Sequence, residues 1–500
     1  MKRVLVANRG EIALRIIRAC HEEGLEAVAV YSEADAHAPH VRAADRAVLI
    51  GPAPSRESYL VMDKLIAAAQ SSGADAIHPG YGFLSERAPF AEAVEAAGLT
   101  FIGPPAKAIR AMGEKTEARR RMDAAGVPVV PGTTAPVTSA EEAVAIGTDL
   151  GFPIMLKAAA GGGGKGMRRV ERPEDVAQAF RAASSEAAAA FGDGSVYIEQ
   201  YVERPRHVEI QVLADRFGHV LHLGERECSI QRRHQKLIEE APSPAVDVDL
   251  RLRMGEAAVQ AARAVGYIGA GTVEFLLAAD GRFYFLEMNT RIQVEHPVTE
   301  LVYGVDLVRE QLRIAAGQPT TLPGRAMRPR GHAIECRIIS EDPFNGFLPA
   351  TGRVAYLRVP TGPGVRWDSG IEQGSDVGVF YDSLLAKLIV WGETRERAIS
   401  RMERALDELV LVGLPTSQAF HRRVLAHPDF RSGHYDIGFL ERHGDALVGG
   451  PSPDDLLRRV ALVAALAEQE ARQAAVPVTE PGGHARESAW VRAARTHGRR

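Results

Sequence analysis

The sequence contains little cysteine. Its 500 residues include three cysteines, Cys20, Cys228 and Cys336, which lie far apart and show no C-x-x-C spacing. The spacing indicates no disulfide framework, so each thiol is interpreted as a small core residue. This usage is typical of a protein from a reducing cytoplasm.

Long apolar runs and a strong charge of one sign are absent as well. No apolar run approaches the ~20 residues needed to cross a bilayer, and the start, Met1-Lys2-Arg3-Val4, leads into a strand without a signal-peptide pattern. We therefore expect a cytoplasmic protein that makes no membrane contact. The net charge of −4 and the pI near 6.5 provide no global basic field, which argues against nucleic acid as a partner.

The amino-terminal part alternates predicted strands and helices. Arg3–Ala7 reads as a buried strand, Glu11–Glu23 as a helix and Glu26–Tyr31 as the next strand, which is the βαβ opening of an α/β domain. The turn Asn8-Arg9-Gly10-Glu11 lacks the G-x-G-x-x-G pattern, so a dinucleotide site is not indicated. With about 150 residues per domain, the whole chain is long enough for about three domains.

Two polar features of this part have alternative interpretations. The face opposite the apolar stripe of the first helix is predicted to be solvated, and it carries Arg15, Arg18 and Glu22. The loop from His78 to Glu86 follows a short strand, and open α/β sheets tend to bind ligands at the carboxyl ends of strands. Tyr81 and Glu86 are therefore candidate site residues, with ordinary turn packing as the alternative.

A glycine-rich loop lies between two predicted strands, Pro153–Lys157 and Met167–Val170. It contains four consecutive glycines followed by Lys165-Gly166. A Walker A loop needs Ser or Thr after the lysine and then a helix, and neither occurs here. Glycine N–H groups can approach anionic oxygens without interference from a Cβ atom. We therefore favour a lid over phosphates, with a flexible linker as the alternative.

Two polar segments follow the lid. The segment His207–Leu213 alternates polar and apolar residues, which predicts a strand with one polar face carrying His207, Glu209 and Gln211. The segment Glu225–Lys236 is rich in cations but lacks the pattern of an amphipathic helix. A solvated charge run is the ordinary explanation, but we place Lys236 in a loop between the polar strand and the next hairpin, which favours anion binding.

That hairpin predicts a metal site. Asp280-Gly281 between two apolar runs is a strong hairpin pattern and, taken as a two-residue turn, sets Glu274 directly opposite Glu287. Facing carboxylates repel each other, whereas Mg²⁺ accepts one or two carboxylates together with substrate phosphates. Hydrated glutamates on a solvent-facing hairpin are the alternative. Arg291 and Glu295 add an anion clamp and a candidate base, so the metal–nucleotide site is favoured.

Several motifs occur in order at family-like spacings: H-P-G-Y-G-F-L-S-E, G-G-G-G-K-G-M, R-H-V-E-I-Q-V, Q-R-R-H-Q-K, G-T-V-E-F, F-L-E-M-N-T-R-I-Q-V-E-H-P-V-T-E and G-H-A-I-E-C-R-I. Through them the chain resembles the biotin carboxylases of the ATP-grasp superfamily over residues 1–445. The resemblance implies an α/β (α+β) fold, that is, an ATP-grasp fold with an N-terminal βαβ Rossmann-like domain, a glycine-lid subdomain and a C-terminal mixed α/β domain. The implied boundaries are 1–113, 114–310 with the lid at 131–203, and 311–447, followed by a helical and then disordered tail, 448–500.

The resemblance also implies an ATP site. The residues expected around ATP are Lys115, Lys157, Gly163, Gly164, Lys165, Gly166, Met167, Glu199, Gln200, Tyr201, Val202, His207, Gln231, His234, Glu274 and Glu287. Gln200 stands where the family often has lysine. Because backbone atoms are expected to make this contact, the departure is interpreted as harmless.

Metal, bicarbonate and biotin sites follow from the same resemblance. Two Mg²⁺ or Mn²⁺ ions are implied, with Glu274, Glu287 and Asn289 as ligands. Bicarbonate is expected on Lys236, Arg291, Gln293 and the backbone of Val294, and the biotin ring on Tyr81, Arg337 and Asp382. Glu295 would remove the bicarbonate proton, and Arg337 would stabilise the enolate-like biotin anion, so the catalytic set is Glu295, Arg291, Arg337 and Lys236.

The expected assembly contains more than this chain. The family attaches biotin to the lysine of an Ala-Met-Lys-Met-type turn, and the sequence contains no such segment. We expect biotin to be a substrate on a separate biotin carboxyl carrier protein, and a carboxyltransferase subunit to complete an acetyl-CoA or other acyl-CoA carboxylase of fatty acid biosynthesis. Residues that match the family's homodimer interface are Arg15, Glu22 and Arg366, which replaces the solvated-face interpretation of the first helix.

Three alternatives to this function are kept. The first is the biotin-carboxylating subunit of a two-subunit pyruvate carboxylase. The second is another ATP-grasp ligase that joins a carboxylate to an amine, for which Arg337 would have no role. The third is a nucleotide-binding scaffold without turnover.

Overall fold

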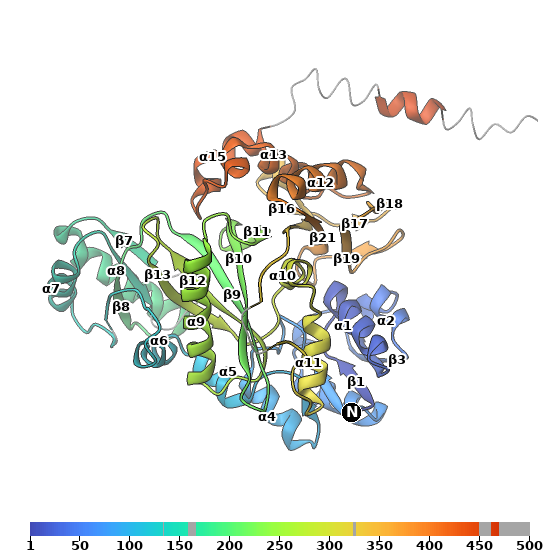
Figure 1. Ribbon diagram of the computed structural model, residues 1–500, viewed down its shortest axis with the longest axis horizontal. Coiled ribbons are helices and arrows are strands. Elements are labelled where there is room, and N and C mark those ends of the chain that lie inside the picture. Colours follow the sequence, from blue (N-terminus) through green and yellow to red (C-terminus); the bar gives the residue numbers. More distant parts are fainter. Residues whose placement is uncertain (134, 159–166, 324–326, 450–461, 470–500) are drawn as a thin grey trace, which may run out of the picture. The chain divides into compact units, whose positions relative to one another are not determined.

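Three main sheets organise residues Met1–Val448 in the computed structural model (Figure 1). The structure describes residues 1–133, 135–158, 167–323, 327–449 and 462–469. Residues Gly449–Arg500 form a separate unit, in which residues 462–469 are a helix. Of the helices described, none combines the length and the apolar character that a membrane span requires.

The first sheet is parallel and confirms the predicted βαβ opening. Its strand order is β3-β2-β1-β4-β5. The strands are β1 (Arg3–Val6), β2 (Glu26–Ser32), β3 (Arg46–Gly51), β4 (Ala76–His78) and β5 (Thr100–Phe101). The helices of this part are α1 (Gly10–Glu22), α2 (Pro39–Ala43), α3 (Met62–Ser72), α4 (Ala88–Ala96) and α5 (Ala106–Gly113), with short 3₁₀ turns at Glu33–Asp35 and Ser55–Glu57. The apolar stripe of α1, with Ile12, Ile16 and Ile17, is fully buried against this sheet and its neighbours.

The second sheet belongs to the predicted lid. Its strands β6 (Ile154–Ala158), β7 (Met167–Val170) and β8 (Val196–Gln200) have the order β7-β6-β8. Helices α7 (Ala140–Leu150) and α8 (Pro173–Phe191) pack on it, and α6 (Lys115–Ala124) precedes it. Strands β6 and β7 pair antiparallel on either side of the glycine loop, which confirms the predicted strand–loop–strand. Gly163, Gly164, Lys165 and Gly166 lie outside the described residues.

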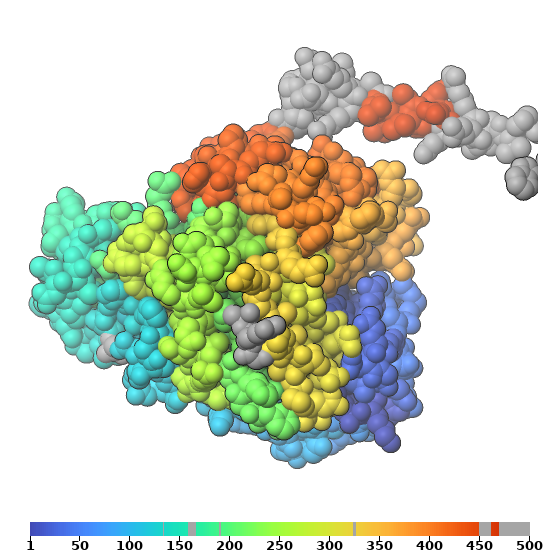
Figure 2. Space-filling view, in the orientation of Figure 1, coloured from blue at the N-terminus to red at the C-terminus, as the bar shows by residue number. Residues whose placement is uncertain are grey.

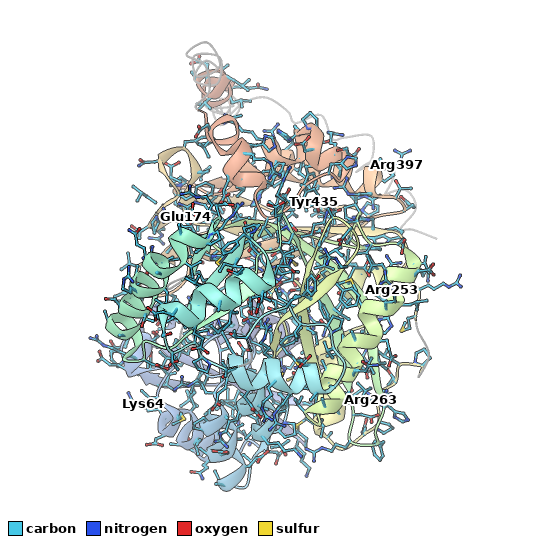
Figure 3. All side chains as sticks on the ribbon, turned by 90° about the vertical axis from the view of Figure 1, so that its left-hand side faces the viewer. Lys64, Glu174, Arg253, Arg263, Arg397 and Tyr435 are labelled. Atoms are coloured by element: carbon cyan, nitrogen blue, oxygen red, sulfur yellow. The ribbon has the colours of Figure 1, made fainter. Side chains whose placement is uncertain are left out.

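The third sheet has eight strands and carries most of the candidate site. Its order is β13-β12-β9-β10-β11-β14-β21-β19. The strands are β9 (Arg206–Ala214), β10 (Val220–Arg232), β11 (Gln235–Ala241), β12 (Gly269–Leu277), β13 (Phe283–Asn289), β14 (His332–Ile339), β19 (Val365–Ser369) and β21 (Leu384–Gly392). Helix α9 (Val248–Ala264) packs on β9 and β10. Its Arg263 is exposed to solvent, whereas the guanidinium of Arg253 lies 6.0 Å from the centre of the Phe283 ring of β13 (Figure 3).

The remaining elements surround the carboxyl-terminal half of that sheet. The helices are α10 (His296–Tyr303), α11 (Leu307–Ala315), α12 (Arg395–Glu408), α13 (Gln418–Ala426), α14 (Pro428–Ser432) and α15 (Phe439–Val448), with a 3₁₀ turn at Pro343–Asn345. Short strands are β15 (Glu341–Asp342), β16 (Leu348–Pro349), β17 (Gly352–Arg353), β18 (Tyr356–Arg358), β20 (Asp376–Val377) and β22 (Val410–Val412). In the space-filling view the blue amino-terminal residues meet the yellow residues near 300–320 (Figure 2), in agreement with the contacts between α1 and α11.

Candidate active site

The hairpin β12–β13 has a different turn from the one predicted. Its loop has three residues, Ala279–Gly281, because the N–H of Ala278 donates to the carbonyl of Arg282 at 2.8 Å. Gly281 takes a left-handed φ of +81°, which a residue with a Cβ adopts less readily. The predicted two-residue turn Asp280-Gly281 is therefore wrong, and the pairing next to the turn is shifted by one residue.

A β-bulge at Leu286 restores the predicted carboxylate pair. Phe275 pairs with Phe285, whereas Glu274 pairs with Glu287, so Leu286 has no residue opposite it. An extra residue in one strand reverses the alternation of its side chains. The bulge thus brings Glu287 to the face of Glu274, and the predicted opposition of the two acids is confirmed.

Glu274 lies at the centre of a group of donors. Its Oε1 atom accepts hydrogen bonds from Lys236 Nζ at 2.9 Å, Asn289 Nδ2 at 2.8 Å and Gln293 Nε2 at 3.1 Å. Its Oε2 atom lies 2.9 Å from His207 Nε2. Burial alone would raise the pKa of Glu274, but Lys236 and His207 hold it well below its ordinary value.

Glu287 has the opposite electrostatic environment. Glu287 is exposed at the surface of the edge strand β13, but partial desolvation and the charge of Glu274 raise its pKa, with Lys115 acting in the other direction. Lys115 is exposed at the first residue of α6. Repulsion between the two facing carboxylates therefore opposes the ionisation of both at once. A bound divalent cation would offset this repulsion and favour the doubly ionised pair.

Lys236 belongs to a strand, not to a loop as predicted. It lies in β11, opposite Gln231 of β10, and the connecting turn Arg233-His234 has left-handed φ values of +48° and +65°. Non-glycine residues rarely adopt this conformation at both positions of a turn. The tight turn leaves His234 exposed, while Lys236 points into the site.

Three carboxylates converge on Lys236. Its Nζ atom lies 2.6 Å from Glu209 Oε2, 2.9 Å from Glu274 Oε1 and 2.7 Å from Glu295 Oε1. Burial alone would lower the pKa of Lys236, but the three acids raise it well above its ordinary value. Lys236 therefore remains a fixed cation in the middle of the site.

A second buried cation, Arg226, was not identified from the sequence. It is fully buried and bonds Glu209 Oε1 at 2.5 Å. Its remaining guanidinium donors reach Gln211, Thr299 and Thr272, at 2.7, 2.9 and 2.9 Å. The alternation in β9 indicated a polar face, but only the register that pairs Arg226 with Glu209 reveals the partner. The predicted polar face is itself buried rather than solvated.

Glu295 is held between two cations. It is fully buried, and its Oε1 atom accepts from Lys236 at 2.7 Å while its Oε2 atom accepts from Arg337 at 2.9 Å. Although burial would raise the pKa of Glu295, Lys236 and Arg337 hold it well below its ordinary value. Glu295 is thus a carboxylate at neutral pH.

Arg337 is fixed at both ends. Its guanidinium donates to Glu239 Oε1 at 2.6 Å. Its carbonyl accepts from Ser417 Oγ at 2.8 Å and lies 2.7 Å from His421 Nε2. Glu239 and these two carbonyl partners had no sequence pattern that marked them, because they come from separate elements.

Arg291, the predicted anion clamp, lies among polar neighbours that hold it in place. Arg291 Nε donates to Glu86 Oε2 at 2.8 Å, and its terminal nitrogens reach Gln293 Oε1 at 2.7 Å and Asn289 Oδ1 at 3.0 Å. Glu86 also accepts from the N–H of Thr290 at 3.0 Å. The candidate role of Glu86 is therefore one of support, which holds Arg291 against the hairpin.

Tyr81 joins a buried acid and a buried lysine. Its hydroxyl donates to Glu11, whose carboxylate lies 3.1 Å from Lys387 Nζ. Lys387 also donates to the carbonyl of Val294 at 2.9 Å. Burial and the charge of Glu11 raise the pKa of Tyr81, and the charges of Asp382 and Arg337 also act on it. Tyr81, Arg337 and Asp382, the predicted biotin residues, therefore surround one region.

The lid side of the site contains another buried acid. The carboxylate of Glu199, in β8, forms an ion pair with the side chain of Lys157, in β6. It also accepts a hydrogen bond from Arg119 NH1 at 2.5 Å. The N–H groups of Gln200 and Tyr201 donate to the carbonyls of Pro131 and Pro153, at 2.8 and 3.0 Å. These two N–H groups are therefore committed within the chain. Met167, at the start of β7, is 41% exposed, and Val202 lies just beyond the end of β8.

The first helix is not solvated at Arg15. This side chain is buried, 2.9 Å from Glu300 and 2.7 Å from Asp306. Arg366 bonds the other oxygen of Glu300 at 2.7 Å. The solvated-face prediction is wrong for Arg15, whereas Arg18 and Glu22 are exposed.

Known proteins match nearly the whole of the Met1–Val448 unit. Three family models match: "Biotin carboxylase, N-terminal domain" over residues 1–109, "Carbamoyl-phosphate synthase L chain, ATP binding domain" over 114–322 and "Biotin carboxylase C-terminal domain" over 335–442. The biotin carboxylase of Nostoc sp. is 55% identical over 439 residues, which are 88% of this chain and 98% of that protein. The chain belongs to the biotin carboxylase family.

Other family members agree with this assignment. A pyruvate carboxylase subunit from Methanothermobacter thermautotrophicus is 52% identical over 88% of this chain and 90% of its own length. A crystal structure described as a biotin carboxylase–beta-gamma-ATP complex from Campylobacter jejuni has a TM-score of 0.84 at 48% identity, and the match covers 88% of this chain and 99% of that one. The predicted ATP-grasp fold is confirmed, and the chain is an ATP-dependent ligase.

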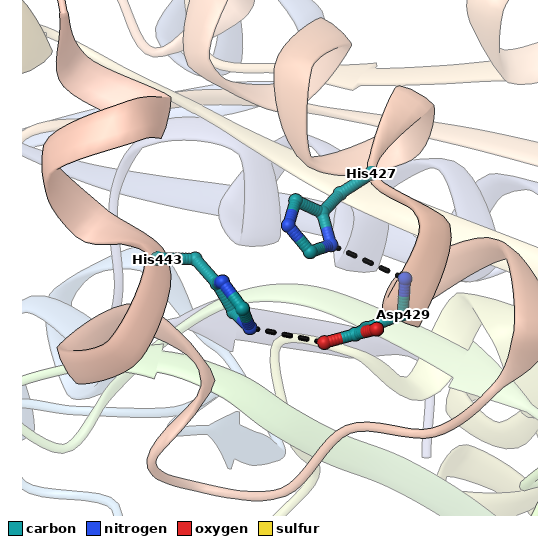
Figure 4. Close-up of side chains that lie close together, drawn as sticks. All are labelled: His427, Asp429 and His443. Carbon is teal, nitrogen blue, oxygen red and sulfur yellow. Dashed lines mark hydrogen bonds and ion pairs between the residues drawn. The ribbon is translucent and has the colours of Figure 1, made fainter.

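A second cluster of metal-ligating side chains lies outside the family's site. Ligand atoms of His427, Asp429 and His443 lie within 4.8 Å of one another (Figure 4). Some of their polar atoms already face one another, since His427 Nδ1 accepts from the N–H of Asp429 at 3.2 Å and His443 Nε2 lies 3.0 Å from Asp429 Oδ2. The rings of the two histidines are 4.2 Å apart. The cluster thus joins α14 to α15 as a structural contact.

Proposed function

We propose that this chain uses MgATP and bicarbonate to carboxylate biotin carried by a separate carrier protein. The observation that carries the proposal is the convergence of Lys236 and Arg337 on the buried carboxylate of Glu295, directly beside Glu274. A fixed base between two fixed cations is what the deprotonation of bicarbonate and the stabilisation of anionic intermediates require.

The donor set fits a nucleotide-bound divalent ion. Glu274 and Glu287 face each other, and the Asn289 side chain reaches Glu274. Oxygen donors of this kind suit Mg²⁺ or Mn²⁺. Two bound ions would neutralise phosphate charge. Lys115, Lys157, His207, Gln231 and His234 would position ATP, and the backbone from Glu199 to Val202 the adenine.

A solved relative supports these ligands. The biotin carboxylase domain dimer of Hydrogenobacter thermophilus 2-oxoglutarate carboxylase has been crystallised with MgADP, ADP and bicarbonate. It is 46% identical to this chain with a TM-score of 0.84, and the match covers 90% of this chain and 99% of that one. We infer that the same classes of ligand bind here.

When bicarbonate binds, it would compete with Glu295 for contact with the neighbouring cations. In the present arrangement Lys236 and Arg337 make Glu295 a weak base, because they stabilise its ionised form and lower its pKa. When the bicarbonate anion binds Lys236, Arg291, Gln293 and the N–H of Val294, part of this stabilisation moves to the substrate. The proton affinity of Glu295 then rises at the step that needs it, the formation of carboxyphosphate by attack on the γ-phosphate of ATP.

The biotin end of the site would stabilise charge on the ureido ring. Carboxyphosphate yields CO₂ and phosphate, and phosphate can accept the N1′ proton of biotin. Arg337 would hold the enolate-like oxygen that results, because Glu239 and the two partners of its carbonyl fix the side chain in advance. Tyr81 and Asp382 would flank the ring.

The proposal extends to the partner subunits and to the complex in which the chain works. We place the chain with a biotin carboxyl carrier protein and a carboxyltransferase subunit, as a homodimer, in an acetyl-CoA or other acyl-CoA carboxylase. A pyruvate carboxylase is the second candidate, because the M. thermautotrophicus pyruvate carboxylase subunit is nearly as similar as the Nostoc protein.

Steady-state hydrolysis of ATP tests the proposal. The purified chain with Mg²⁺ and bicarbonate should release phosphate faster when free biotin is added. Omission of bicarbonate should remove the biotin effect. Binding of ATP without biotin-stimulated hydrolysis would contradict the proposed activity and would favour a scaffold.

A further inference from the structure

Two apolar side chains are exposed close to the proposed biotin site. Val379 is 76% exposed and Phe380 is 50% exposed, in the connection between β20 and β21. Asp382, which acts on Tyr81, follows Phe380 by two residues. When a partner covers large apolar side chains that were exposed to solvent, the free energy of the system falls.

The residue after Phe380 fixes this connection to the amino-terminal part. The hydroxyl of Tyr381 donates to the carbonyl of Ala53 at 2.6 Å and lies 2.5 Å from Ser32 Oγ. The guanidinium of Arg9 lies 4.0 Å from the centre of the Tyr381 ring, and Asp35 holds Arg9 at 2.7 Å. Val379 and Phe380 are therefore presented to solvent by an anchored segment.

A second anchor follows two residues after Tyr381. Ser383 Oγ donates to Glu341 Oε1 at 2.6 Å, and the carbonyl of Ser383 accepts from the N–H of Ser340 at 2.8 Å. Strand β21 then leads to Lys387, which pairs with Arg337 in the sheet. A surface followed directly by two fixed anchors costs little conformational entropy when a partner binds.

We propose that Val379 and Phe380 form a docking lip for the biotin-bearing carrier protein. The inference rests on the proposed function, because it requires biotin to arrive on a protein. The carrier body must stay at the mouth of the site while one lysine–biotin arm reaches Arg337, and the lip lies on the segment that leads to Asp382. Contact surfaces gain most of their affinity from such apolar and aromatic anchors, surrounded by polar residues.

The test compares two forms of the same substrate. The double variant Val379→Ser/Phe380→Ser is assayed with free biotin and with the biotinylated carrier protein. The carrier is purified, through the affinity of its biotin group, from cells of the organism that produces this chain. The matched control is Phe217→Ser. Phe217 is 59% exposed and follows the carboxyl end of β9, at the other end of the strand from His207.

The lip predicts a selective loss. For the double variant, kcat/KM with the biotinylated carrier should fall about tenfold, as expected when two exposed apolar side chains lose a contact. Its kcat/KM with free biotin should stay within about twofold of the parent chain, and Phe217→Ser should be unchanged with both substrates.

Three results would overturn the lip. Equal loss with free and carrier-borne biotin would indicate damage to the site, and no loss with either would remove the contact. A change from dimer to monomer in sedimentation velocity would assign the lip to contact with a second copy of this chain. Failure of the parent chain to respond to free biotin would instead contradict the proposed function, so the two failures are distinguishable.

Discussion

At the scale of single residues, the site depends on buried charges that compensate one another. Arg226 and Glu209 are both fully buried, and Glu209 also accepts from Lys236. A buried ion pair is neutral to stability on average, but the removal of one partner leaves the other charge without compensation. The network can therefore be tested through stability, independently of turnover.

Replacement of Arg226 by Met should destabilise the protein strongly. The change leaves Glu209 with Lys236 as its remaining cation, and we expect a loss of about 3–5 kcal/mol in the free energy of unfolding. Denaturant unfolding followed by circular dichroism measures it. The control is Arg263→Met on the exposed face of α9, for which the loss should stay within about 0.5 kcal/mol. A loss for Arg226→Met as small as that of the control would refute the role of this network.

Some of these residues could be predicted from the sequence, and others could not because their partners lie on distant elements. Glu295 and Arg291 follow the hairpin within a few residues, so local pattern and resemblance identified them. Arg226 and Glu239 act through partners in other strands, and only tertiary register brings them together. The pattern-based solvated face failed for Arg15 because its partner, Glu300, lies 285 residues away.

At the scale of single elements, the hairpin β12–β13 determines the carboxylate pair. The predicted turn was wrong by one residue, and the bulge at Leu286 compensates for that shift. A bulge has no clear sequence pattern, so the correct pair of acids was predicted from an incorrect turn. The bulge is the feature that brings Glu287 to the face of Glu274.

Deletion of Leu286 should keep the two acids opposite each other. Without the extra residue, Glu287 follows Phe285 directly, so regular pairing from the turn sets it opposite Glu274. We expect Mg²⁺-dependent ATP binding to stay within about threefold of the parent chain for this deletion, and to weaken about 10- to 100-fold when one acid is removed by Glu287→Ala, as measured by calorimetry. Leu286→Ala, which keeps the bulge, serves as the control. Unchanged ATP binding in a folded Glu287→Ala variant would show that the facing acids are not needed for metal binding.

At the scale of the whole molecule, the eight-stranded sheet continues across the predicted boundary at residues 310 and 311. Strand β11 of the central part pairs directly with β14 of the carboxyl-terminal part. This pairing was beyond sequence reasoning, because nothing local determines which edge of a sheet receives the next strand. It places Arg337 next to the strand that carries Glu239, so residues of the candidate site from both parts share one sheet.

Acid should destabilise the whole molecule through buried histidines. His40 and His421 are fully buried, and burial lowers the pKa of each to about 4. The unfolded chain takes up these protons as the pH falls below about 6.5, whereas the folded chain does not. Each histidine therefore contributes stability above pH 6.5 that is lost as the pH falls toward 4, at about 1.4 kcal/mol per pH unit.

Denaturant unfolding between pH 7 and pH 4 measures this dependence. His421→Gln keeps a donor near the carbonyl of Arg337 but cannot take up a proton. The free energy of unfolding of this variant should therefore fall less steeply with pH than that of the parent chain, and the difference in slope should correspond to about one proton. His37→Gln, at an exposed position, is the matched control. Equal slopes for all three proteins would contradict a neutral buried His421.

The central claim is that Glu295 and Arg337 form the reaction centre, apart from the ATP site. The most direct measurement is phosphate release with and without free biotin for Glu295→Ala and Arg337→Ala, together with the Kd for MgATP. The account predicts that biotin-dependent turnover falls by about 10²–10³, the loss seen when one stabilising donor is removed, while ATP affinity stays within about threefold of the parent chain. Near-normal biotin-dependent turnover in either variant would contradict it.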